Sequence, residues 1–111
     1  MTIFQKIIEG TISSVKVFEN DRILAIRDIN PVAPVHILIM PKKPIPNLQS
    51  LKKGDSKLVA EIIQVAQQIA KDEGIADGYR LLTNNGESAG QTIFHLHFHL
   101  IGGRPLGHLL G

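Results

Sequence analysis

The stretch His95-Leu-His-Phe-His-Leu100, written HLHFHL, places three histidines at two-residue spacing with an apolar residue after each. Alternation of this kind has the period of a β-strand, in which residues i, i+2 and i+4 project from one face. We therefore expect a strand over residues 93–101, with His95, His97 and His99 on one face and the apolar residues on the core face. The chain has five histidines in 111 residues, so three in one strand need a chemical explanation.

The remaining pattern predicts four more strands and two helices. Apolar residues at helical spacing favour a short helix over residues 2–10 and a long helix over residues 55–73, which Asp55 or Ser56 can cap. One long helix between blocks of strands predicts an α+β fold with a five-stranded, mainly antiparallel sheet. The expected strands are residues 14–19, 22–28, 35–40, 79–83 and 93–101.

Composition limits the protein's class. The length of 111 residues and a hydrophobic content of 43% predict one globular domain over residues 1–111, and no apolar run is long enough to span a bilayer. A net charge of +2 is too small to indicate a nucleic-acid binder. There is no cysteine, which excludes disulfides and thiol nucleophiles. With no signal-peptide pattern at the start, we expect a cytoplasmic protein without membrane or nucleic-acid partners.

Three alternating histidines are compatible with three kinds of surface. One is a solvated sheet face without chemistry. A second is a metal site, but the outer rings of such a strand stand about 13 Å apart, so it would need His95 or His97 to pair with His36. The third is a nucleophilic site for phosphoryl or nucleotidyl transfer, in which adjacent imidazoles attack phosphorus, bind its oxygens and protonate the leaving group. The glycine-containing loop over residues 84–91 lies directly before the histidines and suits an anion.

Several motifs in one order resemble a known family. The segment HLHFHLIGGR, residues 95–104, resembles the histidine triad signature followed by the Gly-Gly-Arg of its nucleotide-binding Hint branch. The segment IRDINPVAPVH, residues 26–36, and IMPKK, residues 39–43, are similar to two further stretches of that branch. Asn84 and the Gly-Gln-Thr of residues 90–92 also stand where the branch keeps such residues. The resemblance covers nearly the whole chain and implies a HIT-like fold.

The resemblance also implies an activity. Members of this branch hydrolyse purine nucleoside 5′-monophosphoramidates through a nucleotidyl-histidine intermediate. By family likeness His97 is the nucleophile, and His99 contacts the phosphate and the leaving group. His95 and His36 support the array by hydrogen bonding. The resemblance implies no required cofactor and no catalytic metal, although zinc binding is compatible with the histidines.

The nucleotide contacts are implied in the same way. Asp28 would accept hydrogen bonds from the ribose hydroxyls, and Ile29, with Phe4 and Leu38, would wall the base. The expected α-phosphate contacts are Asn84, Gly90, Gln91 and Thr92.

The sequence leaves two other functions open. The related Fhit branch, which hydrolyses dinucleoside polyphosphates, uses the same nucleophile, although Gly102-Gly103-Arg104 favours the Hint branch. A mainly non-catalytic nucleotide- or protein-binding module is the third reading. The family implies a homodimer formed by the 55–73 helix and a strand edge. The chain lacks the tryptophan that animal members carry near the end, and His108 has no assigned role.

Overall fold

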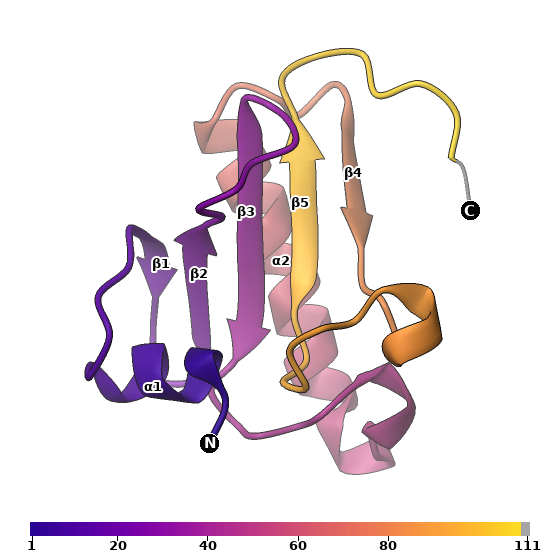
Figure 1. Cartoon of the computed structure of the whole chain (residues 1–111). Coiled ribbons are helices and arrows are strands. Elements are labelled where there is room, and N and C mark those ends of the chain that lie inside the picture. The colour runs from indigo at the N-terminus through magenta and orange to yellow at the C-terminus, as the bar shows by residue number, and fades with distance from the viewer. Residues whose placement is uncertain (110–111) are drawn as a thin grey trace.

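A five-stranded antiparallel sheet in the order β1-β2-β3-β5-β4 forms the centre of the molecule (Figure 1). The structure is a computed structural model and describes residues 1–109. The predicted α+β architecture is confirmed. The strands are β1 (Lys16–Glu19), β2 (Ile23–Arg27), β3 (Val35–Pro41), β4 (Tyr79–Leu82) and β5 (Phe98–Gly102), and the helices are α1 (Ile3–Glu9) and α2 (Ser56–Asp72).

The two helices cover opposite faces of the sheet. The long helix α2 lies behind the sheet in Figure 1, and α1 lies across the other face near β2. Alternate residues of β3 join the two cores: Ile37 and Ile39 belong to the α2 side, whereas Leu38 and Met40 belong to the α1 side. Every residue of β3 is therefore buried, as a strand covered on both faces should be.

The last strand is shorter than predicted. We expected residues 93–101, but β5 begins at Phe98, so His95 and His97 precede it. The neighbouring strand β3 ends at Pro41, and the proline-rich segment after it cannot supply a regular ladder of N–H donors. Leu96 instead donates its N–H to the carbonyl of Ile45, with 2.7 Å between nitrogen and oxygen. The alternation survives, because Leu96 still packs into the α2-side core.

The long helix begins as predicted, but Asp55 does not cap it. The Asp55 carboxylate accepts a hydrogen bond from the backbone N–H of Lys52 at 3.0 Å and one from Lys43 Nζ at 2.6 Å. These bonds tie the turn before α2 to the end of β3. The helix is held chiefly by its apolar stripe, whose buried members are Ile62, Val65, Ala66, Ile69 and Ala70.

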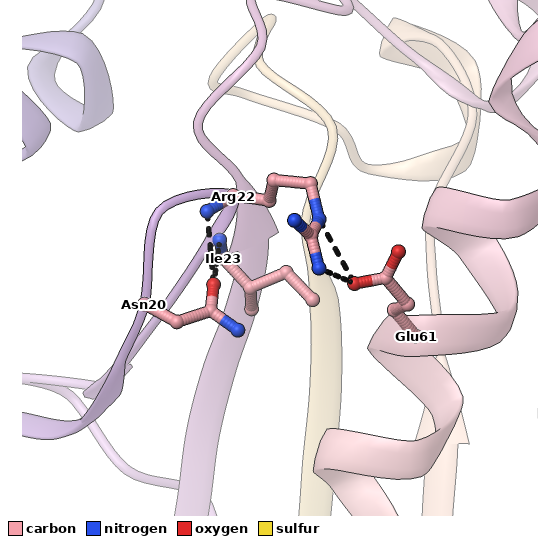
Figure 2. Close-up of polar contacts among 4 residues, drawn as sticks. All are labelled: Asn20, Arg22, Ile23 and Glu61. Atoms are coloured by element: carbon pink, nitrogen blue, oxygen red, sulfur yellow. Dashed lines mark hydrogen bonds and ion pairs between the residues drawn. The ribbon is translucent and has the colours of Figure 1, made fainter.

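Figure 2 shows a second link between α2 and the sheet. Asn20 Oδ1 accepts hydrogen bonds from the backbone N–H groups of Arg22 and Ile23 at 2.9 and 2.8 Å, which closes the β1–β2 turn. The Arg22 guanidinium then pairs with Glu61 on the helix. None of the helices in the described part of the chain has the length and apolar character that a bilayer-spanning segment needs.

We expect the core contact of α2 to dominate stability. Ile62 is fully buried, so Ile62→Ala should lower the free energy of unfolding by about 2–5 kcal/mol. Chemical denaturation of the variant and the wild type measures the difference. Arg22→Met, which removes only an exposed ion pair, is the control and should leave the denaturation midpoint nearly unchanged. Equal losses in the two variants would contradict this account of the core.

Candidate active site

Three imidazoles form a row on the α1 face of the sheet. His36 comes from β3, His99 from β5, and His97 from the segment before β5. The ring centroids of His36 and His99 are 5.2 Å apart, and those of His99 and His97 are 5.1 Å apart. Phe4 of α1 closes the row, with its ring edge-on to His97 at 4.9 Å. The structure thus brings together three of the four predicted catalytic histidines.

The backbone fixes which nitrogen of His97 is free. His97 Nδ1 lies 2.7 Å from the carbonyl oxygen of His95, which can only accept, so Nδ1 carries the proton and Nε2 keeps its lone pair. Thr83 supports this arrangement by donating its hydroxyl to the His97 carbonyl at 2.7 Å. No sequence pattern singled out Thr83. An imidazole held in this tautomer is a ready nucleophile at Nε2.

A second chain of hydrogen bonds fixes the proton of His99. The backbone N–H of Val32 donates to His36 Nδ1 at 3.2 Å, so the proton of His36 lies on Nε2. That Nε2 lies 2.9 Å from His99 Nδ1, which therefore accepts. The remaining proton of His99 is on its Nε2. The row consequently presents a lone pair on His97 beside an N–H donor on His99.

His95 lies beneath the row and is fully buried. Its Nε2 donates to the carbonyl of Pro41 at 2.7 Å, while Nδ1 has no partner among the described residues. The ring contributes no exposed nitrogen to a ligand. Its contribution is positional, because the bond to Pro41 holds the His95 carbonyl where His97 Nδ1 needs an acceptor.

Burial favours the neutral forms of His95, His97 and His99 by lowering their pKa values. Burial chiefly, with the neighbouring rings of His97 and His36, lowers the pKa of His99 from 6.5 to about 4, against the opposing charge of Asp28. Burial likewise lowers the pKa of His97, against the opposing effects of its bond to the His95 carbonyl and the charge of Asp28. The pKa of His95 is lowered for the same principal reason.

A metal ion does not suit these residues. Asp28, His36 and His99 bring ligand atoms within 4.8 Å of one another, which differs from the sequence-based alternative of His95 or His97 with His36. A metal on His36 Nε2 would displace the proton from that nitrogen. His36 Nδ1 already accepts from the Val32 N–H, so metal binding would either leave the ring an imidazolate or break this hydrogen bond. The hydrogen-bond pattern therefore favours a metal-free site.

A largely apolar cavity of about 460 Å³ opens beside His36. Of the residues predicted to contact a nucleotide, five line it: Phe4, Asp28, Ile29, Leu38 and Thr92. Asp28 Oδ1 accepts from the N–H of Asn30 at 2.8 Å, and Oδ2 lies 3.4 Å from His36 Nε2. The apolar walls come chiefly from Phe4, Ile7, Ile26, Leu38 and Ile93.

The predicted phosphate loop is held by Gln91. The side chain of Gln91 is buried and accepts from the Gly86 N–H at 2.8 Å. It also donates to the carbonyls of Pro46 and Ile93 at 2.8 and 3.1 Å. These bonds occupy the amide, so Gln91 anchors the loop and has no free donor for a nucleotide. Asn84 and Gly90 belong to the same loop but do not line the cavity.

Known proteins resemble this chain over nearly its whole length. The HIT domain family model matches residues 9–106. A HIT-like protein of Chlamydia pneumoniae is 54% identical over 96% of this chain and 97% of its own length. A protein of Escherichia coli named purine nucleoside phosphoramidase is 47% identical over 98% of this chain and 92% of its own. A HIT family hydrolase from Legionella pneumophila superposes with a TM-score of 0.95 at 44% identity, covering 96% of both chains.

The low pKa of His99 has a measurable consequence. In an NMR titration of the histidine rings, His99 should stay neutral down to a pH of about 4. Because the unfolded chain takes up this proton near pH 6.5, the free energy of unfolding should fall as the pH drops from 6.5 towards 4. Titration of His99 near pH 6.5 would show that the row is not desolvated.

Proposed function

The chain belongs to the HIT family of hydrolases, and from this premise we propose that it cleaves the P–N bond of purine nucleoside 5′-monophosphoramidates. The main support for this proposal is the position of the protons on the rings of His97 and His99. A free lone pair on His97 stands next to an N–H donor on His99, and both rings are held neutral. Attack on phosphorus needs such a nucleophile beside a donor for the leaving group.

The proposed reaction has two steps. His97 Nε2 attacks the α-phosphorus and forms a P–N bond, while the bond from phosphorus to the amine breaks. His99 gives its Nε2 proton to the departing amine nitrogen. Water then attacks phosphorus and gives one of its protons to His99 Nε2, which breaks the bond from phosphorus to His97, releases the nucleoside monophosphate and restores both histidines. His36 orients His99 by donating to its Nδ1, and its bond from Val32 keeps that direction fixed.

The cavity suits a nucleoside. Its apolar walls match the faces of a purine, and Asp28 at its side has carboxylate lone pairs left for ribose hydroxyls. Ile29, whose side chain is 90% exposed at the rim, would cover the base. Thr92 on the cavity wall, with Asn84 and Gly90 of the loop, would contact the phosphate. The E. coli relative's printed name, purine nucleoside phosphoramidase, supports the same substrate class.

We also propose a homodimer and a cytoplasmic location. The edge strand β4 is unpaired on one side in the described sheet, and Tyr79 on it is partly exposed. Ile63 on α2 is 43% exposed although it belongs to the apolar stripe. Apolar residues of this kind favour a partner surface. A chain without cysteine suits a reducing compartment.

The catalytic assignment is tested by His97→Ala. We expect this variant to lose turnover of an adenosine phosphoramidate, by about a thousandfold or more, because the covalent route needs this nucleophile. Nucleotide binding should persist in a titration with adenosine monophosphate. Mass spectrometry of quenched wild-type reactions should find a nucleotidyl adduct on His97.

His108→Ala is the matched control, since His108 is an exposed histidine away from the row. Substantial turnover in the His97 variant would overturn the assignment. Cleavage of a dinucleoside polyphosphate in preference to the phosphoramidate would favour the Fhit-type reading. A rate lost with a chelator and restored by zinc would favour a metal mechanism.

The dimer is tested by Ile63→Lys. Sedimentation equilibrium should give two chains for the wild type and a strongly weakened association for the variant, because a lysine charge would be buried against the partner helix. Lys57→Ala, at an exposed position of the same helix, should leave the mass unchanged. A wild-type protein that sediments as one chain at micromolar concentration would contradict the proposal.

A further inference from the structure

The segment Gly102-Gly103-Arg104 follows the histidines directly, and the structure gives each residue a physical task. A Cβ at Gly102 would lie 2.8 Å from Ile75 Cδ1 and 3.2 Å from the Gly78 carbonyl oxygen, so a larger residue here would require Ile75 to shift. Gly103 has a φ of +94°, in the left-handed region, and a Cβ there would meet Pro34 at 3.0 Å. The chain therefore turns sharply beside Pro34, and this turn brings Arg104 to the segment that carries His36.

The Arg104 guanidinium holds that segment in place. Its Nη2 donates to the carbonyl of Val32 at 2.8 Å, and its Nη1 donates to the carbonyl of Pro105 at 2.8 Å. Val32 is the residue whose N–H donates to His36 Nδ1. Val32 is thus held by Arg104 through its carbonyl and orients His36 through its N–H.

The chain of contacts continues to the reacting end of the row. His36 Nε2 lies 2.9 Å from His99 Nδ1, and the outer nitrogen of His99 carries the proton proposed for the leaving amine. The two tautomers of a neutral imidazole differ little in free energy, so one well-placed donor decides between them. Without the Val32 N–H against Nδ1, only His99 Nδ1 and the more distant Asp28 Oδ2, 3.4 Å away, would favour the proton on His36 Nε2, and the other tautomer would become populated. His99 would then lose the donor that fixes its own tautomer.

We propose that Arg104 is a positioning residue that sets the tautomers of His36 and His99 through the backbone of Val32. The catalytic part of this inference rests on the proposed function, whereas the tautomers are properties of the free protein. Other anchors of the segment do not replace Arg104. The backbone bond from Asp28 to His36 and the bond from Asn30 to Asp28 hold its first residues, but neither reaches Val32.

The test combines ring NMR with kinetics in three variants. Arg104→Met removes the donors and keeps a long side chain, and Arg104→Lys keeps one donor group and the charge. Arg80→Met is the matched control, because Arg80 also donates from Nη2 to a backbone carbonyl, that of Gly107, at 2.9 Å. Imidazole ¹⁵N shifts are recorded at pH 7 without ligand, and kcat and KM are measured with an adenosine phosphoramidate. Thermal unfolding shows that each variant is folded.

In the wild type, His36 should show an unprotonated Nδ1 and His99 a protonated Nε2. In Arg104→Met, the two nitrogen shifts of His36 should converge, and kcat should fall about three- to tenfold with little change in KM, as for the loss of one hydrogen bond of ordinary strength. Arg104→Lys should recover part of both signals. Arg80→Met should match the wild type.

Three results would overturn the inference. The first is a wild-type ¹⁵N pattern for His36 in Arg104→Met. The second is the same disturbance in Arg80→Met, which would mean that the tail as a whole, and not Arg104, orders the segment. The third is an altered tautomer with an unchanged kcat. Failure of the wild type to cleave a phosphoramidate would instead reject the proposed function, and the NMR comparison would still decide the role of Arg104.

Discussion

The antiparallel pairing of β3 with β5 is the constraint on which the rest of the site depends. Its register sets Leu38 opposite His99 and His36 opposite Ile101, so the two histidines are diagonal neighbours on the same face. Their 2.9 Å hydrogen bond is a direct product of that register. A slip of one residue would turn His99 into the α2-side core and bring an apolar side chain to face His36.

Around this pair, backbone groups do most of the orienting. Carbonyl oxygens accept from His97 and His95, and an amide donates to His36. Backbone groups cannot change their protonation, so they are dependable partners for fixing a tautomer. The arrangement also has a cost, since the buried Nδ1 of His95 finds no partner in the described structure. The unpaired nitrogen lowers the local stability, and the fold accepts this loss while His95 holds its carbonyl beside His97.

Much of the fold followed from local patterns, whereas the site required contacts between distant segments. The period of the helix at residues 55–73 and the alternation at residues 95–100 predicted their elements and the core faces. The late start of β5, at Phe98 and not at residue 93, was missed, because it depends on the bond between Leu96 and the distant Ile45. The sequence also did not show that Gln91 anchors the loop, because one of its hydrogen-bond partners is the carbonyl of Pro46, which is distant in the sequence. Family likeness supplied the residues of the site but not their proton arrangement.

The position of Phe4 has a practical consequence for dividing this chain. The family match starts at residue 9, so Phe4, which packs edge-on against His97 and lines the cavity beside His36, lies upstream of it. A fragment cut at the match would keep every histidine and the whole sheet. It would uncover Leu24, Leu38 and Met40, which now lie under α1, and expose the ring of His97 to water. The segment that matches the family is therefore shorter than the segment that is needed to form the site.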